Sequence, residues 1–462
     1  MVFRPVTTES KELVADRQYT DIPRVGQEAG GSLDTEFSFG NMDPLLEGAF
    51  FNPWVQMPYR YNNGIADSII TDVLATVVTV TNPAVEATGQ GAFAAGHLIT
   101  GSGFGVAGNN ITARCTAGSA TSATITGFAT EAVPPAQARL KVVGLEGVAG
   151  DITITFTTVF LLNTTALNFT TLGIVAGMWV RLGGAAVGTQ FATAADNDWV
   201  RVSAVLSTIQ LQLDRTPVGF AADTGATKTI RVWIGDYLRN GTTKRYNSIE
   251  QQYQDLAAPE FDTYAGMLGD TFDLTLAQQA IKTSKLGFIG FGATNSTTRF
   301  AGSTDVTTDY LGAVPRTGDV FNTSSNVARV AENGTPIATN FVQGLTIAMA
   351  NGLRRQNAVG TLASIGIGAS RCKVTGTLNT YYFSNAIRTK LLAGTATAID
   401  TRVVDPAGIR AYVVDLPRVK LTDGTPDGIQ VDSDRTLNAQ FQALKDPTLG
   451  FTIQVGRFEQ FA

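Results

Sequence analysis

Short runs of alternating apolar and polar residues recur along most of the chain. Four of these runs are Thr76–Val80, Asp151–Phe156, Thr208–Leu213 and Phe451–Val455. Alternation of this kind puts successive side chains on opposite faces of a β-strand, one buried and one exposed. Helical spacing is confined to Met42–Phe50 and Asn385–Gly394, and we expect Gly394 to end the second helix. The pattern predicts an all-β protein with two or three short helices.

Charge is distributed unevenly along the chain. The 462 residues include 34 basic and 39 acidic side chains, a net charge of −5. Residues 76–235 are rich in Ala, Gly and Thr and hold eight charges of each sign, so the other residues carry the whole net charge. A neutral, charge-poor block inside a more charged chain predicts an insertion (residues 76–235) within a frame formed by the flanking residues.

The insertion contains an internal repeat. Ala95–Gly103 resembles Ala176–Gly184, and Arg139–Gly144 resembles Thr229–Gly235. Fixed motifs that recur in the same order predict two related structural units. We therefore expect one small β unit over residues 76–145 and a second over 146–235.

The frame contains a second repeat, in which a strand, a short helix, a strand and a meander follow one another twice. The first copy begins near Leu33 and the second near Lys373. This order predicts two copies of one β-sandwich unit. Residues 1–75 and 236–334 would form the first copy and a linker, and residues 335–462 the second. Residues 1–28, which are polar and contain two prolines, are expected to form an extended arm.

The composition excludes several kinds of catalytic site. The chain has one histidine, His97, and two cysteines, so zinc sites built on two histidines or four cysteines are impossible. His97 aligns with Met178 in the repeat, which predicts a packing position. No Gly-Lys-Ser/Thr completes a phosphate-binding loop after Gly101–Gly105. We therefore expect no enzyme, no cofactor and no metal site.

Neither a signal peptide nor a membrane-spanning segment is expected. The first residues lack the apolar stretch of a secretory signal, and no apolar run approaches about 18 residues. We predict synthesis in a reducing cytoplasm and no membrane partner.

Several short segments of the frame occur in an order known from one family. They are Gly30–Phe39, Asp43–Glu47, Tyr246–Asp255, Val374–Leu378, Leu416–Leu421 and Ala443–Pro447. In this order they resemble the tail tube proteins, also called major tail proteins, of siphoviruses, the long-tailed bacteriophages. The resemblance implies a virion structural protein with a β-sandwich or barrel frame. Its subunits would form stacked rings, a hollow conduit for genome ejection.

The resemblance also implies partners and a location. Rings in this family are generally six-fold, so two tube domains in one chain would give trimeric, pseudo-six-fold rings, with hexamers as the alternative. The implied partners are other copies of the chain, a tape measure protein, and the tail terminator and distal tail proteins. Double-stranded DNA would pass through without specific binding. The protein would be assembled in the host bacterial cytoplasm and reside in the virion tail, with the insertion on the outside.

Seven residues are candidates for contacts between subunits or rings. They are Arg4, Arg17, Arg24, Arg354, Arg355, Arg457 and Phe461. The resemblance implies that the N-terminal arm reaches the adjacent ring, and that the C-terminal segment either does the same or caps a sheet. Adjacent arginines at 354 and 355 form the densest basic spot, which suits a phosphate, an acidic neighbour in the next ring or simple exposure to solvent; among contacts we favour a salt bridge between subunits.

Two other functions are compatible with the same pattern. A receptor-binding or glycan-binding adhesin at the tail tip would make use of the Thr-rich and Gly-rich insertion. The inner tube of a contractile tail would share the fold of a siphovirus tube.

Overall fold

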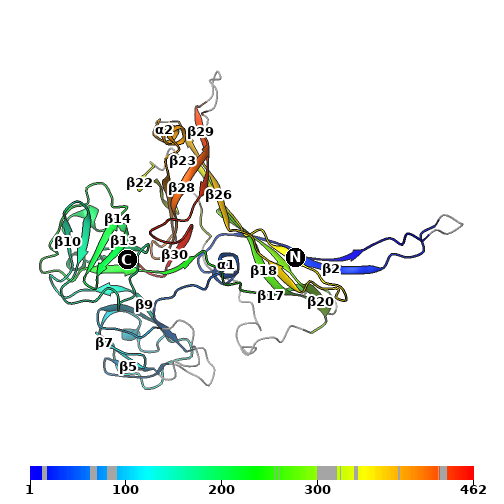
Figure 1. The fold of residues 1–462 in the computed structure, drawn as a ribbon. Coiled ribbons are helices and arrows are strands. Elements are labelled where there is room, and N and C mark those ends of the chain that lie inside the picture. Colours follow the sequence, from blue (N-terminus) through cyan, green and yellow to red (C-terminus); the bar gives the residue numbers. More distant parts are fainter. Residues whose placement is uncertain are drawn as a thin grey trace.

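The computed structural model describes residues 1–12, 18–62, 70–80, 91–253, 255–256, 258, 260–298, 320–322, 324–337, 342–382, 385–424, 426 and 434–461. Strands account for 50% of the chain and helices for 6%, which confirms the all-β prediction. The strands form two large antiparallel sheets and one two-stranded sheet (Figure 1). Among the described residues these sheets do not close into a barrel.

The first large sheet belongs to the frame. Its central path is β1-β2-β19-β18-β23-β26-β29-β28-β27-β21-β22, and the other strands pair at its sides. The strands are β1 (Val2–Thr7), β2 (Arg24–Glu36), β16 (Asp236–Arg239), β17 (Asn247–Tyr253), β18 (Glu260–Ala277), β19 (Thr283–Gly290), β20 (Gly292–Ser296), β21 (Val327–Glu332), β22 (Thr335–Pro336), β23 (Val342–Ala350), β26 (Lys373–Tyr381), β27 (Thr397–Val404), β28 (Ala411–Asp423), β29 (Thr436–Ala443) and β30 (Gln454–Phe458).

The second large sheet contains the strands of the insertion. They are β3 (Tyr59–Tyr61), β4 (Ile70–Leu74), β5 (Val77–Val80), β6 (His97–Ser102), β7 (Thr112–Gly118), β8 (Ser122–Ile125), β9 (Arg139–Glu146), β10 (Thr153–Phe156), β11 (Phe160–Asn163), β12 (Trp179–Leu182), β13 (Trp199–Ser207), β14 (Gln210–Asp214) and β15 (Arg231–Ile234). Two of them, β3 and β4, precede residue 76, so pairing within this sheet begins earlier than the charge pattern suggested. The domain limits after residues 75, 145, 235 and 334 stay predictions.

Two α-helices lie where the sequence predicts them. These are α1 (Asp43–Phe50) and α2 (Ala386–Ala393). Gly394 follows α2 with φ of 60°, a left-handed conformation that glycine adopts without a steric penalty. Its N–H caps the helix at the carbonyls of Lys390 and Leu391, which confirms Gly394 as the end of the helix.

The two halves of the frame share one strand topology. In the first half, β2, α1, β17, β18 and β19 follow in the chain, and the pairs are β2–β19, β19–β18 and β18–β17. In the second half, β26, α2, β27, β28 and β29 follow, and the pairs are β26–β29, β29–β28 and β28–β27. We call these the first and second copies. β1 pairs with β2 as β23 pairs with β26.

The insertion repeats a turn as well as its strands. In the first unit the side chain of Asn110 accepts the Phe104 N–H and donates to the Phe104 carbonyl, both at 2.9 Å. Asn197 and Phe191 make the same pair of bonds in the second unit, at 2.7 and 3.0 Å. The units meet through β9 and β15, which pair antiparallel at the centre of the sheet.

Buried apolar side chains form one core in each of the two large sheets, a third cluster between these sheets, and a fourth, small cluster that includes Leu268 and Leu353. The third cluster joins Trp179, Trp199 and Trp233 of the insertion to Val413 and Phe458 of the frame. Because burial of apolar surface drives association, this cluster holds the insertion against the second copy. Figure 1 shows the insertion beside β28 and β30, on the side of the frame away from the arm.

Candidate assembly surfaces

The arm is an antiparallel hairpin that projects from the edge of the frame (Figure 1). Arg4 and Arg24 lie on its two strands. Arg24 donates to the Gln27 side chain at 2.5 Å and lies over the Phe3 ring, 5.3 Å from its centroid. Arg17 lies outside the described residues. The Arg4 side chain is exposed, whereas Arg24 makes contacts within the arm.

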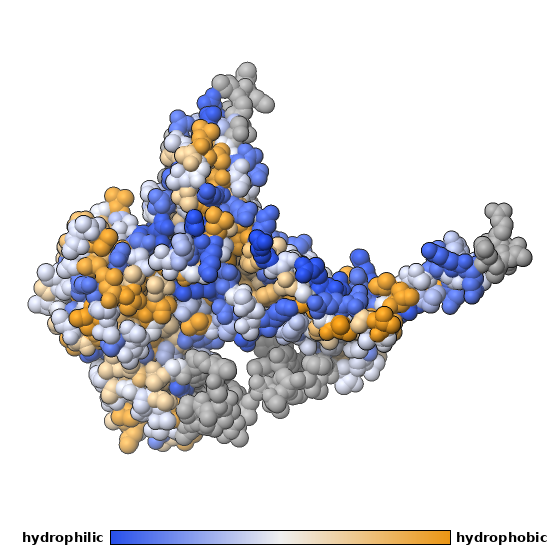
Figure 2. Space-filling model, viewed as in Figure 1, coloured by the Kyte–Doolittle hydropathy of each residue, from blue (hydrophilic) through white to orange (hydrophobic). Residues whose placement is uncertain are grey.

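Exposed aliphatic side chains lie on the inner part of the arm. Val2, Val6 and Val25 are 47%, 39% and 52% exposed. Figure 2 shows apolar colour here and polar colour further out along the arm. An apolar stretch on an edge strand is a surface suited to contact with another chain.

Arg354 and Arg355 lie in β24 (Arg354–Gln356), which forms a small hairpin with β25 (Gly366–Gly368). The two side chains have different roles. Arg354 is exposed and donates to Ser370 Oγ at 2.8 Å. Arg355 donates to the Ala29 carbonyl at 2.6 Å and lies 3.8 Å from Glu28. Of the two adjacent arginines, Arg355 therefore makes a contact within the chain, whereas Arg354 is an exposed cation.

Arg457 is enclosed within its own chain. Its guanidinium pairs with Asp43 of α1 at 2.6 Å and with Asp236 of β16 at 2.5 Å, and its side chain is 14% exposed. Burial opposes the charge on Arg457, but the two carboxylates outweigh it and raise its pKa. Tyr412 completes the site by donating to Asp43 at 2.6 Å. The Arg457 guanidinium therefore makes its ion pairs within its own chain.

The same network reaches into the insertion. Lys141 of β9 lies 2.7 Å from Asp236, and the two side chains are 6% and 0% exposed. Burial disfavours the Asp236 carboxylate, but Lys141 and Arg457 outweigh that effect and hold its pKa below the usual value. Arg201 of β13 makes a second bridge, 2.9 Å from Asp415 of β28. These ion pairs fix the insertion to the frame.

Phe461 belongs to the junction between insertion and frame. It is 7% exposed and packs against Trp199, with ring centroids 5.1 Å apart. Its carbonyl accepts from Arg181 at 2.8 Å, and the Gln460 side chain accepts from Thr100 at 2.7 Å. The C-terminal segment therefore caps the insertion within its own chain.

Sequence reasoning missed the residues that hold the two sheets together. Lys141 lies in the apolar strand Leu140-Lys-Val-Val, and Asp236 follows Trp233-Ile-Gly. A charged side chain inside an apolar run is the signal that could have revealed them, because buried charges need partners. The apolar run does not show which residue is the partner of the buried charge, because Asp43 and Arg457 are far away in the sequence.

Two features bear on the catalytic sites considered from the sequence. His97 is 1% exposed, as expected for a packing position, and burial lowers its pKa to about 4. No group of three or more His, Cys, Asp or Glu residues in this part of the chain is placed to hold a metal ion. Within the same residues, no helix combines the length and apolar character needed to cross a membrane.

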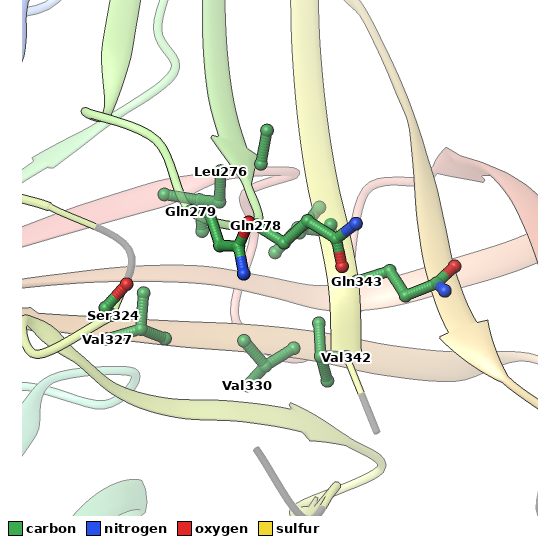
Figure 3. A pocket seen from close by; sticks show the side chains of 11 residues that line it. Leu276, Gln278, Gln279, Ser324, Val327, Val330, Val342 and Gln343 are labelled. Carbon is green, nitrogen blue, oxygen red and sulfur yellow. The ribbon is translucent and has the colours of Figure 1, made fainter. Parts of the chain in front are cut away.

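A cavity of about 380 Å³ lies between β18, β21 and β23 (Figure 3). Its described lining includes Leu276, Gln278, Gln279, Ser324, Val327, Val330, Val342 and Gln343. None of the described lining residues has an ionisable side chain, so none can donate or accept a proton near neutral pH. The cavity lies beside the place where β18 of the first copy pairs with β23 of the second.

Comparison with known proteins agrees with this picture. No curated protein matched the chain. The model of a family described as phage tail tube protein matches residues 177–443, more than half of the chain. The matched range covers β12–β15 of the insertion, β16–β20 of the frame, and the second copy as far as the end of β29. The chain therefore belongs to the phage tail tube protein family, whose members are structural subunits that assemble into the tube of the virion tail.

Proposed function

We propose that the protein forms closed rings that stack into the tail tube of a siphovirus and that the phage genome leaves through this conduit. The observation that carries the proposal is the duplicated frame. The two copies are joined edge to edge through β18 and β23, and β1 remains as an outer edge of the same sheet. Continuing that pairing to further chains would leave no unpaired edge in a closed ring.

The duplication favours three chains in each ring. Each chain supplies two units of the same topology, so a trimer would hold six units around its axis. The insertion would lie outside, since it packs on the second copy away from the arm and a lumen that passes DNA has little room for 160 residues per chain. The proposed partners at the ends and in the lumen are the terminator, distal tail and tape measure proteins. We propose assembly in the host cytoplasm.

Negative-stain electron microscopy of the concentrated protein tests this proposal. We expect hollow rings or stacked tubes whose averaged end views show three outer lobes around a pseudo-six-fold wall. Six identical outer lobes in each ring would refute the trimer, and insertions that fill the lumen would refute their outward placement. A concentrated protein with no closed or stacked assembly would contradict ring formation.

A further inference from the structure

The two frame copies can be compared residue by residue. Gly31-Ser-Leu-Asp-Thr35 in β2 corresponds to Gly376-Thr-Leu-Asn-Thr380 in β26. The register agrees with this alignment, because Gly31 lies opposite Phe288 of β19 and Gly376 lies opposite Phe441 of β29. Each phenylalanine also pairs with a residue of the following strand in the sheet, β18 or β28, and in both copies a bulge in that strand comes directly after this pair. Residues of β2 therefore correspond to residues of β26 that are 345 positions later.

The correspondence extends to the hairpin at the end of each copy. Pairing in the arm slips by one residue after Val6, between Val6–Gly26 and Thr7–Arg24. The second copy shows the same slip between the last pair of β23 with β26, Ala350–Lys373, and the first pair of β24 with β25, Arg354–Gly368. The hairpin β24–β25 is thus the counterpart of the outer arm, which we define as residues 7–12 and 18–24.

Within the chain, β24–β25 packs against the base of the arm. Arg355 donates to the Ala29 carbonyl at 2.6 Å and pairs with Glu28 at 3.8 Å. The Gln27 N–H donates to the Leu362 carbonyl at 2.9 Å. In Figure 1 the described part of the outer arm extends away from the sheet and from β26 and β29 of the second copy.

The surface equivalent to the arm base is open in the second copy. By the register, Glu28 corresponds to Lys373, and Arg355 corresponds to Glu9 of the outer arm. A cavity of about 720 Å³ lies beside Lys373 and is also lined by Arg354, Arg371 and Cys372. We call these four residues the socket. Glu9 and Lys373 are exposed, and neither has an ion-pair partner among the described residues.

The charges of the outer arm and the socket are complementary. Residues 8–23 contain four acidic and two basic side chains, and residues 351–373 contain four basic side chains and no acidic one. The ion pair at the joint within the chain is Arg355 with Glu28. The equivalent joint between chains would pair Glu9 with Lys373, with the two signs exchanged.

We propose that the outer arm of one chain docks on the socket of a neighbouring chain in the same ring, with Glu9 facing Lys373 of the partner subunit. The proposal rests on the ring assembly proposed above. The exchanged charges also select the order of the copies. An arm placed on a first copy would bring Glu9 against Glu28, and β24–β25 placed on the socket would bring Arg355 against Lys373. Repulsion between like charges would disfavour both of these alternative contacts. First and second copies of the frame therefore alternate around the ring.

Charge reversal tests the pair. Glu9→Lys and Lys373→Glu each place like charges at the joint, and we expect each to lower the assembled fraction in sedimentation by about tenfold. The double variant restores opposite charges and should return to within about twofold of the unaltered protein. Lys228→Glu, in the insertion, is the matched control and should assemble normally. Circular dichroism of each variant monitors folding. Single variants that assemble normally would overturn the docking, as would a double variant that stays unassembled although folded.

A disulfide distinguishes contact within a ring from contact between rings. Glu9→Cys and Lys373→Cys are combined with Cys372→Ser, and the oxidised protein is run on a non-reducing gel. Docking within a ring predicts covalent products that stop at the number of chains in one ring. A ladder that continues beyond that number, or the absence of cross-links in a variant that still forms tubes, would overturn the docking and leave the tube function intact. If the unaltered protein formed no rings, the proposed function and the docking would both fall.

Discussion

Asp236 is the residue whose loss should most weaken the attachment of the insertion to the frame. Its fully buried carboxylate lies 2.7 Å from Lys141 and 2.5 Å from Arg457, and it accepts the Met57 N–H at 2.7 Å. Asp236→Asn keeps the shape but removes the charge. Lys141, 6% exposed, would then have no anion among the described residues beside it. Removing one partner of a buried ion pair costs about 3–5 kcal/mol, and we expect an effect of that size on the free energy of unfolding.

Urea unfolding followed by tryptophan fluorescence measures this effect. The matched control is Asp34→Asn, because Asp34 and Lys285 are 67% and 52% exposed and lie 3.4 Å apart. An exposed pair contributes about 0–1 kcal/mol. Equal losses for the two variants would refute the argument from burial. Asp236→Asn combined with Lys141→Met should recover part of the loss, because it leaves no unpaired lysine.

The pH dependence of Asp236→Asn gives a second check. The pKa of Asp236 in the folded protein lies below its usual value. A depressed pKa stabilises the fold above the unfolded pKa of about 3.9, and that contribution disappears as the pH falls through the folded pKa. The difference in unfolding free energy between the unaltered protein and the variant should therefore shrink as the solution becomes acidic. A difference that grows on acidification would contradict the assigned direction.

Three further predictions concern other parts of the frame. Lys282 is fully buried, its Nζ has no hydrogen-bond partner among the described residues, and burial lowers its pKa to about 7. Its charging penalty is complete below pH 7 and fades as the pH rises toward the unfolded pKa of about 10.4, so Lys282→Met should stabilise the protein more at pH 6 than at pH 9 in thermal unfolding. A Cβ at Gly376 would lie 2.1 Å from the Thr346 carbonyl oxygen, so Gly376→Ala should cost about 1–3 kcal/mol in urea unfolding, whereas Gly108→Ala, with open space around it, should stay within about 0.5 kcal/mol. Deletion of residues 1–28 should leave a folded protein, by circular dichroism, that forms neither closed rings nor stacked tubes in electron micrographs; tubes of normal length from this form would refute the role of the arm.

Local patterns predicted the elements that depend on neighbouring residues. The helix ending at Gly394 was predictable because a left-handed cap favours glycine whatever lies around it. The repeated order of strand, short helix and strand, beginning near Leu33 and again near Lys373, predicted two equivalent halves of the frame. The abundance of β-branched residues and the scarcity of helical spacing were sufficient for the fold class.

The candidate contact residues were harder to interpret, because exposure is a property of the assembled fold. Arg354 and Arg355 are adjacent in the chain, yet one faces solvent and the other binds the arm base. Arg457 and Phe461 resemble surface residues of a terminal segment, but the fold turns both inward. A sequence states that a side chain is charged or aromatic and leaves open which distant segment will cover it.

The sequence by itself thus determined an all-β chain with few, short helices, because alternation and capping are read from residues close together; the insertion and the duplicated frame stay predictions. Only the tertiary structure decided that Asp43, Lys141, Asp236 and Arg457 meet in one buried network. It also showed that β24–β25 is the counterpart of the arm. These contacts join residues that are tens to hundreds of positions apart in the sequence. Such contacts depend on strand register and on the burial of whole sheets, which no local pattern contains.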